Sequence, residues 1–120
     1  MQILVVDDSK AMRMIVRRTL RMAGFHNEIK EASCGAEALD AVRSGGIGLV
    51  LCDWNMPEMN GLEFLTKLRS EGQQVGLGFV TSESSSDARS TAKEAGALFL
   101  IAKPFTPEAF RDTLSPILGA

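Results

Sequence analysis

Five short apolar runs, each followed by a stretch with helical spacing, limit the fold of this chain more than any other feature. Runs such as 2–7 and 47–52 show almost no alternation of polar and apolar residues, which is typical of strands buried on both faces. Parallel strands need long crossover connections, and these are right-handed. The sequence therefore predicts an α/β domain over residues 1–120, with a parallel sheet covered by helices on both faces. Strands are expected at 2–7, 27–32, 47–52, 75–81 and 98–102, and helices at 9–24, 35–43, around 62–68, at 87–95 and from 107 onward.

Residues that cap or break helices support these boundaries. Asp8 and Ser9 are suitable N-cap residues for the first helix, and Gly24 is a natural stop after it. Pro107 suits the first turn of the last helix, because its missing N–H would have no partner there. Pro116 lies further along the same helix and is expected to end or kink it.

Composition narrows the class of protein. A chain of 120 residues fits one domain, and its net charge of -2 gives no reason to expect nucleic-acid binding. The chain has no apolar run of about 18 residues and no basic leader, so we expect no membrane span and a cytoplasmic location. Cys34 and Cys52 have neither CxxC nor zinc spacing and are expected to be reduced and inert. We expect a monomer.

The chemistry is expected at the carboxyl ends of the strands, where open α/β sheets bind their ligands. Asp7 and Asp8 end the first strand, Asp53 ends the third, and Thr81 and Lys103 end the fourth and fifth. Three carboxylates this close normally need a cation or shift their protonation, and an all-oxygen donor set selects a hard ion such as Mg²⁺. With an ammonium and a hydroxyl beside them, they could bind a phosphoryl group, and a carboxylate can accept one covalently.

Each of these residues also has a simpler interpretation when taken alone. Asp7 and Asp8 could start a turn and cap a helix, Thr81 could be a turn residue, and Lys103 could be a solvated lysine. The functional interpretation is favoured because all of them belong to one edge of the sheet. His26 lies at the opposite end, so histidine-based catalysis has no support.

The residues at the strand ends resemble those of the response-regulator receiver family, and most closely its single-domain chemotaxis regulators of the CheY type. The matching motifs run in order along nearly the whole chain: Val5-Val6-Asp7-Asp8-Ser9, Cys52-Asp53-Trp54-Asn55-Met56-Pro57, Asn60-Gly61, Val80-Thr81 and Lys103-Pro104-Phe105. The resemblance implies a flavodoxin-like (βα)5 fold, a doubly wound parallel sheet with strand order 2-1-3-4-5.

The resemblance also implies roles for the acidic residues. Asp53 would accept a phosphoryl group from a phosphohistidine of a sensor histidine kinase. Asp8 would ligate Mg²⁺ directly, Asp7 would hold it mainly through water, and Asp53 and the backbone carbonyl of Asn55 would complete the metal site.

The remaining site residues would respond to phosphorylation. Lys103 would pair with Asp53 at rest and with the phosphoryl oxygen afterwards, and the Lys103–Pro104 bond would be cis. Thr81 would swing toward the phosphoryl group as the switch movement. Asn55 and Glu83, two residues beyond Asp53 and Thr81, would tune hydrolysis, and their pairing implies a short-lived phosphoryl state.

Leu100 departs from the family pattern. The family usually places an aromatic residue there, which turns inward as the threonine moves and couples phosphorylation to the output face. Leu100 has a smaller body and no hydroxyl, and the chain has no tyrosine at all. We therefore expect the output surface, in the 84–105 region, to be recognised by its partner in a way that differs from the usual one in the family.

The first helix is strongly basic. It carries Lys10, Arg13, Arg17, Arg18 and Arg21 and no acidic residue. Four of these lie near one face at three- and four-residue spacing. One interpretation is a solvated face, and the other is docking to an acidic kinase or phosphotransfer surface. Charge reversal at Arg13 and Arg17 should then slow transfer from a kinase but not from small phosphodonors.

The sequence favours a phosphorylation switch that is not a turnover enzyme and that binds a downstream protein, with chemotaxis as one possible pathway. A receiver fragment of a larger regulator and a phosphorelay intermediate remain alternatives. A phosphatase of the haloacid-dehalogenase type fits less well, because it would want a D-x-D pattern after the first strand, where Asp7-Asp8-Ser9 stands. A DNA-binding regulator would need an effector domain beyond the last helix.

Overall fold

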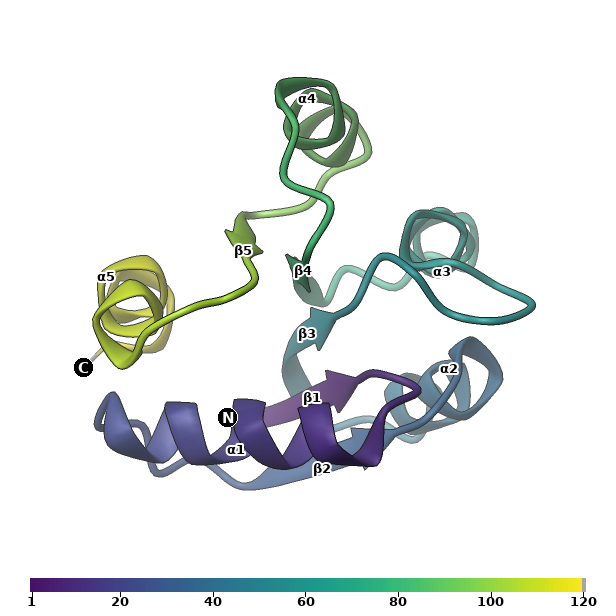
Figure 1. Ribbon diagram of the computed structural model, residues 1–120. Helices are drawn as coiled ribbons and strands as arrows, with labels where there is room; N and C mark the ends of the chain where they lie inside the picture. Colours follow the sequence, from purple (N-terminus) through teal and green to yellow (C-terminus); the bar gives the residue numbers. More distant parts are fainter. Residues whose placement is uncertain (120) are drawn as a thin grey trace.

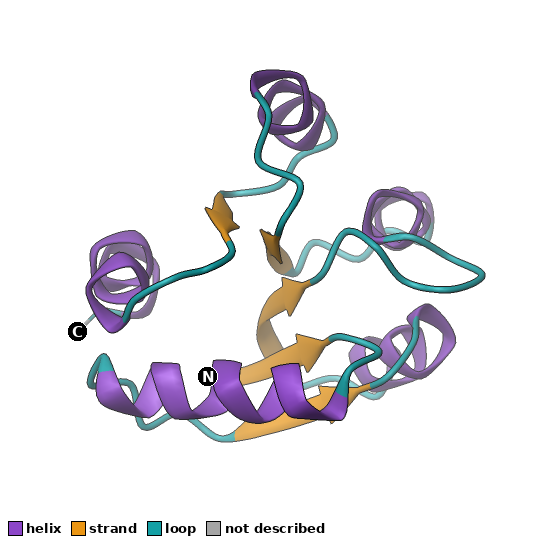
Figure 2. Ribbon diagram, in the orientation of Figure 1, coloured by secondary structure: helices purple, strands orange, loops and turns teal. Residues whose placement is uncertain are grey.

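The computed structural model describes residues 1–119 as five strands that alternate with five helices, which Figure 2 shows by colour. In chain order these are β1 (Gln2–Val6), α1 (Lys10–Met22), β2 (Ile29–Ala32), α2 (Gly35–Arg43), β3 (Ile47–Cys52), α3 (Gly61–Ser70), β4 (Gly76–Thr81), α4 (Ser86–Glu94), β5 (Leu100–Ala102) and α5 (Pro107–Leu118).

The strands form one parallel sheet in the order β2-β1-β3-β4-β5, so the predicted fold class and strand order are confirmed. β1 lies between β2 and β3, and its last residue, Val6, is opposite Cys52 of β3. This register brings the residues that follow the two strands, Asp7 and Asp53, to neighbouring positions at one edge. A backbone hydrogen bond of 2.9 Å from the Asp53 N–H to the Val6 carbonyl extends the ladder to that point.

Helices cover both faces of the sheet (Figure 1). α1 and α5 contact each other on one face, over a core that includes Ile3, Leu20 and Phe110. The other face carries α2, α3 and α4 over a second core that includes Phe64 and Phe79. The central strands β1, β3 and β4 send apolar side chains into both cores, as the sequence predicted, whereas the edge strand β2 carries exposed Lys30 and Glu31.

Capping residues fix where the helices begin near the site. The Ser9 hydroxyl accepts a hydrogen bond from the Met12 N–H at the start of α1. Asn60 and Glu63 form a reciprocal capping box at the start of α3. Gly61 follows this cap, and a Cβ atom there would lie 2.4 Å from the backbone oxygen of Asp53. Only glycine lets α3 start this close to the end of β3.

Some predicted boundaries differ from the structure. β2 and β5 begin later than expected, at Ile29 and Leu100, and Leu98 is 56% exposed. Of the two effects predicted for Pro116, an end or a kink, the end is wrong, since α5 continues to Leu118. Proline here is in the final turn, so few backbone bonds depend on it. The helix ends instead at Gly119, whose φ of 74° is left-handed.

The described helices, up to residue 119, include none with the length and apolar character that a bilayer crossing requires.

Candidate functional site

Three carboxylates come together at the carboxyl edge of the sheet. Asp7 and Asp8 follow β1, and Asp53 follows β3, the neighbouring strand. One oxygen of each lies within 4.8 Å of the others. Asp7 is buried, Asp53 is 9% exposed, and Asp8 is open to solvent. The cluster therefore has a closed side within the protein and an open side that a small ligand could reach.

Asp7 is the most constrained of the three. Its N–H donates to the Ala32 carbonyl of β2 (3.1 Å), and its carboxylate accepts a bond from the Ser9 N–H (2.9 Å). Its backbone carbonyl accepts a 2.7 Å bond from Arg13 Nη1. Its second carboxylate oxygen pairs with Lys103 Nζ at 3.2 Å. The position of Asp7 is thus set by β2, by α1 and by the segment after β5.

Lys103 places an ammonium group between two of the carboxylates. Its Nζ lies 3.2 Å from Asp7 Oδ2 and 3.4 Å from Asp53 Oδ2, and its side chain is 18% exposed. Its own N–H donates to the Thr81 carbonyl (2.9 Å), which ties the residue to the end of β4. The peptide bond to Pro104 is cis, as the resemblance implied. Lys103 contacts both acids, whereas sequence reasoning paired it with Asp53 alone.

Burial and crowding affect the acid–base properties of this edge. Burial raises the pKa of Asp7 above its ordinary value; the charge of Asp53 adds to this, and the Ser9 N–H and Lys103 oppose it. Burial also raises the pKa of the Cys52 thiol well above its ordinary value, with the nearby Asp53 and Asp7 charges adding. Cys52 is therefore a poor nucleophile, as the sequence predicted.

The predicted switch and tuning residues lie around this cluster. Thr81 is completely buried, and its hydroxyl accepts a 3.2 Å hydrogen bond from the Glu83 N–H. The side chains of Asn55 and Glu83 are exposed on the loops after β3 and β4. Leu100 is half-buried on β5 and packs against the core that covers the α2–α4 face. The Thr81 hydroxyl is thus engaged by the backbone of its own loop.

The donor set of the cluster fits a hard divalent cation. All three side chains offer carboxylate oxygens, and their 4.8 Å spread is small enough for one ion to contact them together. The Asn55 backbone carbonyl, two residues after Asp53, is a fourth oxygen on the same loop. Such an ion would relieve the repulsion that Lys103 only partly offsets.

The structure also contains a contact that sequence reasoning missed. Arg13 was assigned to a solvated or docking face of α1, but its Nε pairs with Glu31 of β2 at 2.9 Å. Arg17 pairs with the other Glu31 oxygen at 2.8 Å. Hydrogen bonds from Arg17 and then from Arg13 lower the pKa of Glu31, despite some opposing burial. The four-residue spacing of the two arginines was visible, but their shared acid lies in another element.

Comparisons with known proteins agree with this fold. A family model for the response regulator receiver domain matches residues 3–115. A chemotaxis protein CheY homolog of Campylobacter jejuni is 41% identical over 99% of this chain and 93% of its own length. Vibrio cholerae chemotaxis protein CheY4 has a TM-score of 0.85 and 34% identity, with 98% of each chain covered. The Francisella response regulator 1452 receiver domain, at 20% identity, shares the fold with a TM-score of 0.87.

The raised pKa of Asp7 predicts how stability depends on pH in metal-free buffer. An acid whose pKa is raised in the folded state destabilises the fold once pH exceeds that pKa, and this cost disappears as pH falls to the ordinary value. We expect Asp7→Asn to raise the free energy of unfolding at neutral pH, with the gain shrinking toward acidic pH.

Urea unfolding with a chelator present, at neutral and at acidic pH, measures this difference. Asp8→Asn is the control, because it removes a charge from the same cluster without removing a buried carboxylate. It should give a smaller gain at neutral pH. A destabilised Asp7→Asn protein at neutral pH would show that the bonds to Ser9 and Lys103 outweigh the burial cost.

Proposed function

The chain belongs to the response regulator receiver domain family, and from this premise we propose that it is a phosphorylation switch whose acceptor is Asp53. The observation that carries the proposal is the position of Lys103, whose ammonium lies between the Asp7 and Asp53 carboxylates at an edge that also holds Asp8. Carboxylate nucleophile, cation-binding oxygens and a fixed positive charge are the parts that phosphoryl transfer to an aspartate requires.

In the proposed reaction an Asp53 carboxylate oxygen attacks the phosphorus of a phosphohistidine on a sensor kinase or phosphotransfer protein. The new P–O bond forms as the P–N bond to the histidine breaks, and the imidazole leaves with the bonding electrons. Lys103 Nζ, already 3.4 Å from Asp53, then donates to a phosphoryl oxygen. Mg²⁺, when bound, would neutralise charge on the carboxylates and on the transferred group. Asp8 would hold it directly, Asp7 through water, with Asp53 and the Asn55 carbonyl completing the site.

We assign the switch movement to Thr81. Its hydroxyl accepts a 3.2 Å hydrogen bond from the Glu83 N–H, which leaves its own proton for a phosphoryl oxygen. Movement of Thr81 toward that oxygen would strain the bond to Glu83 and so act on the loop at the start of the 84–105 region. Asn55 and Glu83 lie exposed on the two loops that border the acceptor, where they would control water access and keep the phosphoryl state short-lived.

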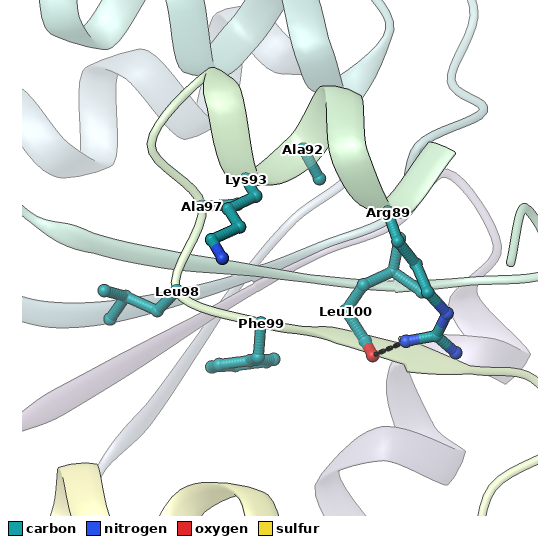
Figure 3. Close-up of a pocket in the computed structure, with 7 residues that line it drawn as sticks. All are labelled: Arg89, Ala92, Lys93, Ala97, Leu98, Phe99 and Leu100. Atoms are coloured by element: carbon teal, nitrogen blue, oxygen red, sulfur yellow. Dashed lines mark hydrogen bonds between the residues drawn. The ribbon is translucent and has the colours of Figure 1, made fainter. Parts of the chain in front are cut away.

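The output surface is proposed to be the hollow between α4 and β5, which has a volume of about 450 Å³ (Figure 3). Its lining combines exposed Leu98 and half-buried Leu100 with the cations Arg89 and Lys93. Arg89 donates to the carbonyls of Ser84 (3.3 Å) and Leu100 (3.2 Å), so one side chain joins the loop after Thr81 to the edge strand. A partner segment that combines acidic residues with an apolar side chain suits this lining. We place the interaction in the cytoplasm.

Acetyl phosphate tests the acceptor directly. With Mg²⁺ present, we expect intact mass to show a single added phosphoryl group on the wild-type chain and none on Asp53→Asn. Lys103→Met should reduce labelling about 100-fold, because the charge that stabilises the transferred group is lost. Asp40→Asn, an exposed acid on α2, is the control and should label normally. Steady turnover of phosphate esters without a retained group would support an enzyme of the aspartyl-phosphate phosphatase class instead.

A second prediction concerns docking of the phosphodonor on α1. Arg13 and Arg17 are paired with Glu31, and half-buried Arg21 donates to the Phe25 carbonyl (2.8 Å). The exposed cations of α1 that form no ion pair within residues 1–119 are Lys10 and Arg18, which flank exposed Met14. Reversing both charges (Lys10→Glu with Arg18→Glu) should slow transfer from the kinase about tenfold through a slower encounter. The rate with acetyl phosphate should not change.

Lys67→Glu, on α3 across the sheet, is the control for this docking experiment and should leave both rates unchanged. Equal losses with kinase and acetyl phosphate in the Lys10 and Arg18 variant would contradict docking on α1.

A third prediction concerns the output surface. Beryllofluoride, which mimics a phosphoryl group on Asp53, should make the chain retain a downstream protein from cell extract that the free form does not retain. Leu98→Asp should abolish this retention, because it places a charge in the apolar part of the hollow. Met14→Asp, a comparably exposed residue on α1, is the matched control and should retain the same protein. Equal retention by the free and treated forms would contradict a phosphorylation-dependent output face.

A further inference from the structure

We propose that Arg13 is a positioning residue for the acidic cluster: its guanidinium fixes the Asp7–Asp8 peptide and thereby the direction of the Asp8 carboxylate. The inference rests on the proposed function in one respect, since it takes the cluster to be a divalent cation site. It assigns to a basic residue of α1 a role inside the site instead of on a docking surface.

The guanidinium of Arg13 is tied at two ends to two strands. Nη1 donates to the Asp7 carbonyl just beyond β1 at 2.7 Å, and Nε donates to Glu31 of β2 at 2.9 Å. The side chain is only 14% exposed. A guanidinium is planar, so fixing two of its nitrogens fixes the orientation of the whole group. The direction from which it approaches the Asp7 carbonyl is therefore set.

Glu31 is a firm anchor for this arrangement. It lies in β2 opposite Val5 of β1, two residues before Asp7, so the sheet ladder holds its backbone. Its second carboxylate oxygen is paired with Arg17. An acid bonded by two arginines stays ionised and has little freedom to change rotamer. Arg13 thus connects the turn after β1 to a residue that the sheet ladder and a second ion pair hold in place.

Asp8 depends on this connection more than its neighbours do. Within the described part of the chain its carboxylate makes no hydrogen bond or ion pair, unlike Asp7 and Asp53. With no contact of its own, the carboxylate is placed by the direction in which the backbone points the Asp8 Cα–Cβ bond and by the rotamers open to it. The Asp7 carbonyl and the Asp8 N–H belong to one rigid peptide plane, which Arg13 holds from the carbonyl side. On the other side of Asp8, the Ser9 N–H is fixed to the Asp7 carboxylate.

Positioning and simple electrostatics make opposite predictions for Arg13. A positive charge near the cluster disfavours a cation, so removing it should tighten Mg²⁺ binding if charge alone mattered. Loss of a positioning bond should weaken Mg²⁺ binding instead, as loss of outer contacts to metal ligands does. Arg17 is the matched control, because it has the same charge and the same partner, Glu31, but no bond to Asp7.

The experiment titrates Mg²⁺ into the full chain and follows the fluorescence of Trp54, the residue after Asp53 and the single tryptophan of the sequence. We expect both Arg13→Lys and Arg13→Gln to raise the Kd for Mg²⁺ about tenfold. Arg13→Lys keeps the positive charge but loses the planar guanidinium that donates to two partners. Arg17→Gln should leave it unchanged or slightly lower. In metal-free protein, the amide NMR signals of Asp8 and Ser9 should shift in both Arg13 variants but not in Arg17→Gln.

Several results would overturn the inference. Wild-type Mg²⁺ affinity in Arg13→Lys and Arg13→Gln would do so, as would an equal loss in Arg17→Gln, which would make the Glu31 ion pairs merely structural. Failure of the proposed function is distinguishable from these: the wild type would then show no Mg²⁺ response at all. The metal-free NMR shifts still decide whether Arg13 orients the Asp8 backbone, and unshifted signals would overturn the positioning role.

Discussion

The repulsion among three carboxylates at one edge of a parallel sheet governs the rest of this site. Strand order puts Asp7 and Asp53 side by side, and neither can move away because each is bonded into the ladder. Lys103 contacts both acids, but one ammonium cannot balance three carboxylates. The protein is left with a local excess of negative charge in a partly buried place, which a divalent cation can relieve.

The surrounding contacts hold this unfavourable arrangement in place. β2 holds the Asp7 N–H, α1 holds its carbonyl through Arg13, and the segment after β5 brings Lys103. The start of α3 lies against the Asp53 backbone, and no residue larger than glycine would fit at position 61. Contacts from four different parts of the fold therefore converge on two acidic residues. Such convergence keeps the ligand-binding oxygens in place while they still lack a cation, which is what preorganisation of a site means.

Much of this could be predicted from the sequence, because strand ends in a parallel sheet must share an edge. The positions of Asp7, Asp53 and Lys103 follow from where the apolar runs stop. The Arg13–Glu31 pair could not be predicted in this way, because it depends on how α1 is rotated over β1 and β2. The hydrogen bond between the Thr81 hydroxyl and the Glu83 N–H could not be predicted either, since it depends on the rotamer of one side chain. Periodicity and strand ends predict backbone placement, whereas pairings between elements depend on helix rotation and side-chain rotamers.

The same distinction applies to Leu100, the one departure from the family pattern. An aromatic ring could report the movement of Thr81 by changing rotamer, but Leu100 is held in the core of the α2–α4 face by apolar packing. The polar link to the loop after Thr81 runs instead through the Leu100 backbone, whose carbonyl Arg89 bonds together with that of Ser84. β5 is the edge strand, so this carbonyl has no strand partner on its outer side and is free to accept the guanidinium. In this chain the link between β5 and the loop after Thr81 is therefore made by hydrogen bonds to backbone carbonyls and not by an aromatic side chain.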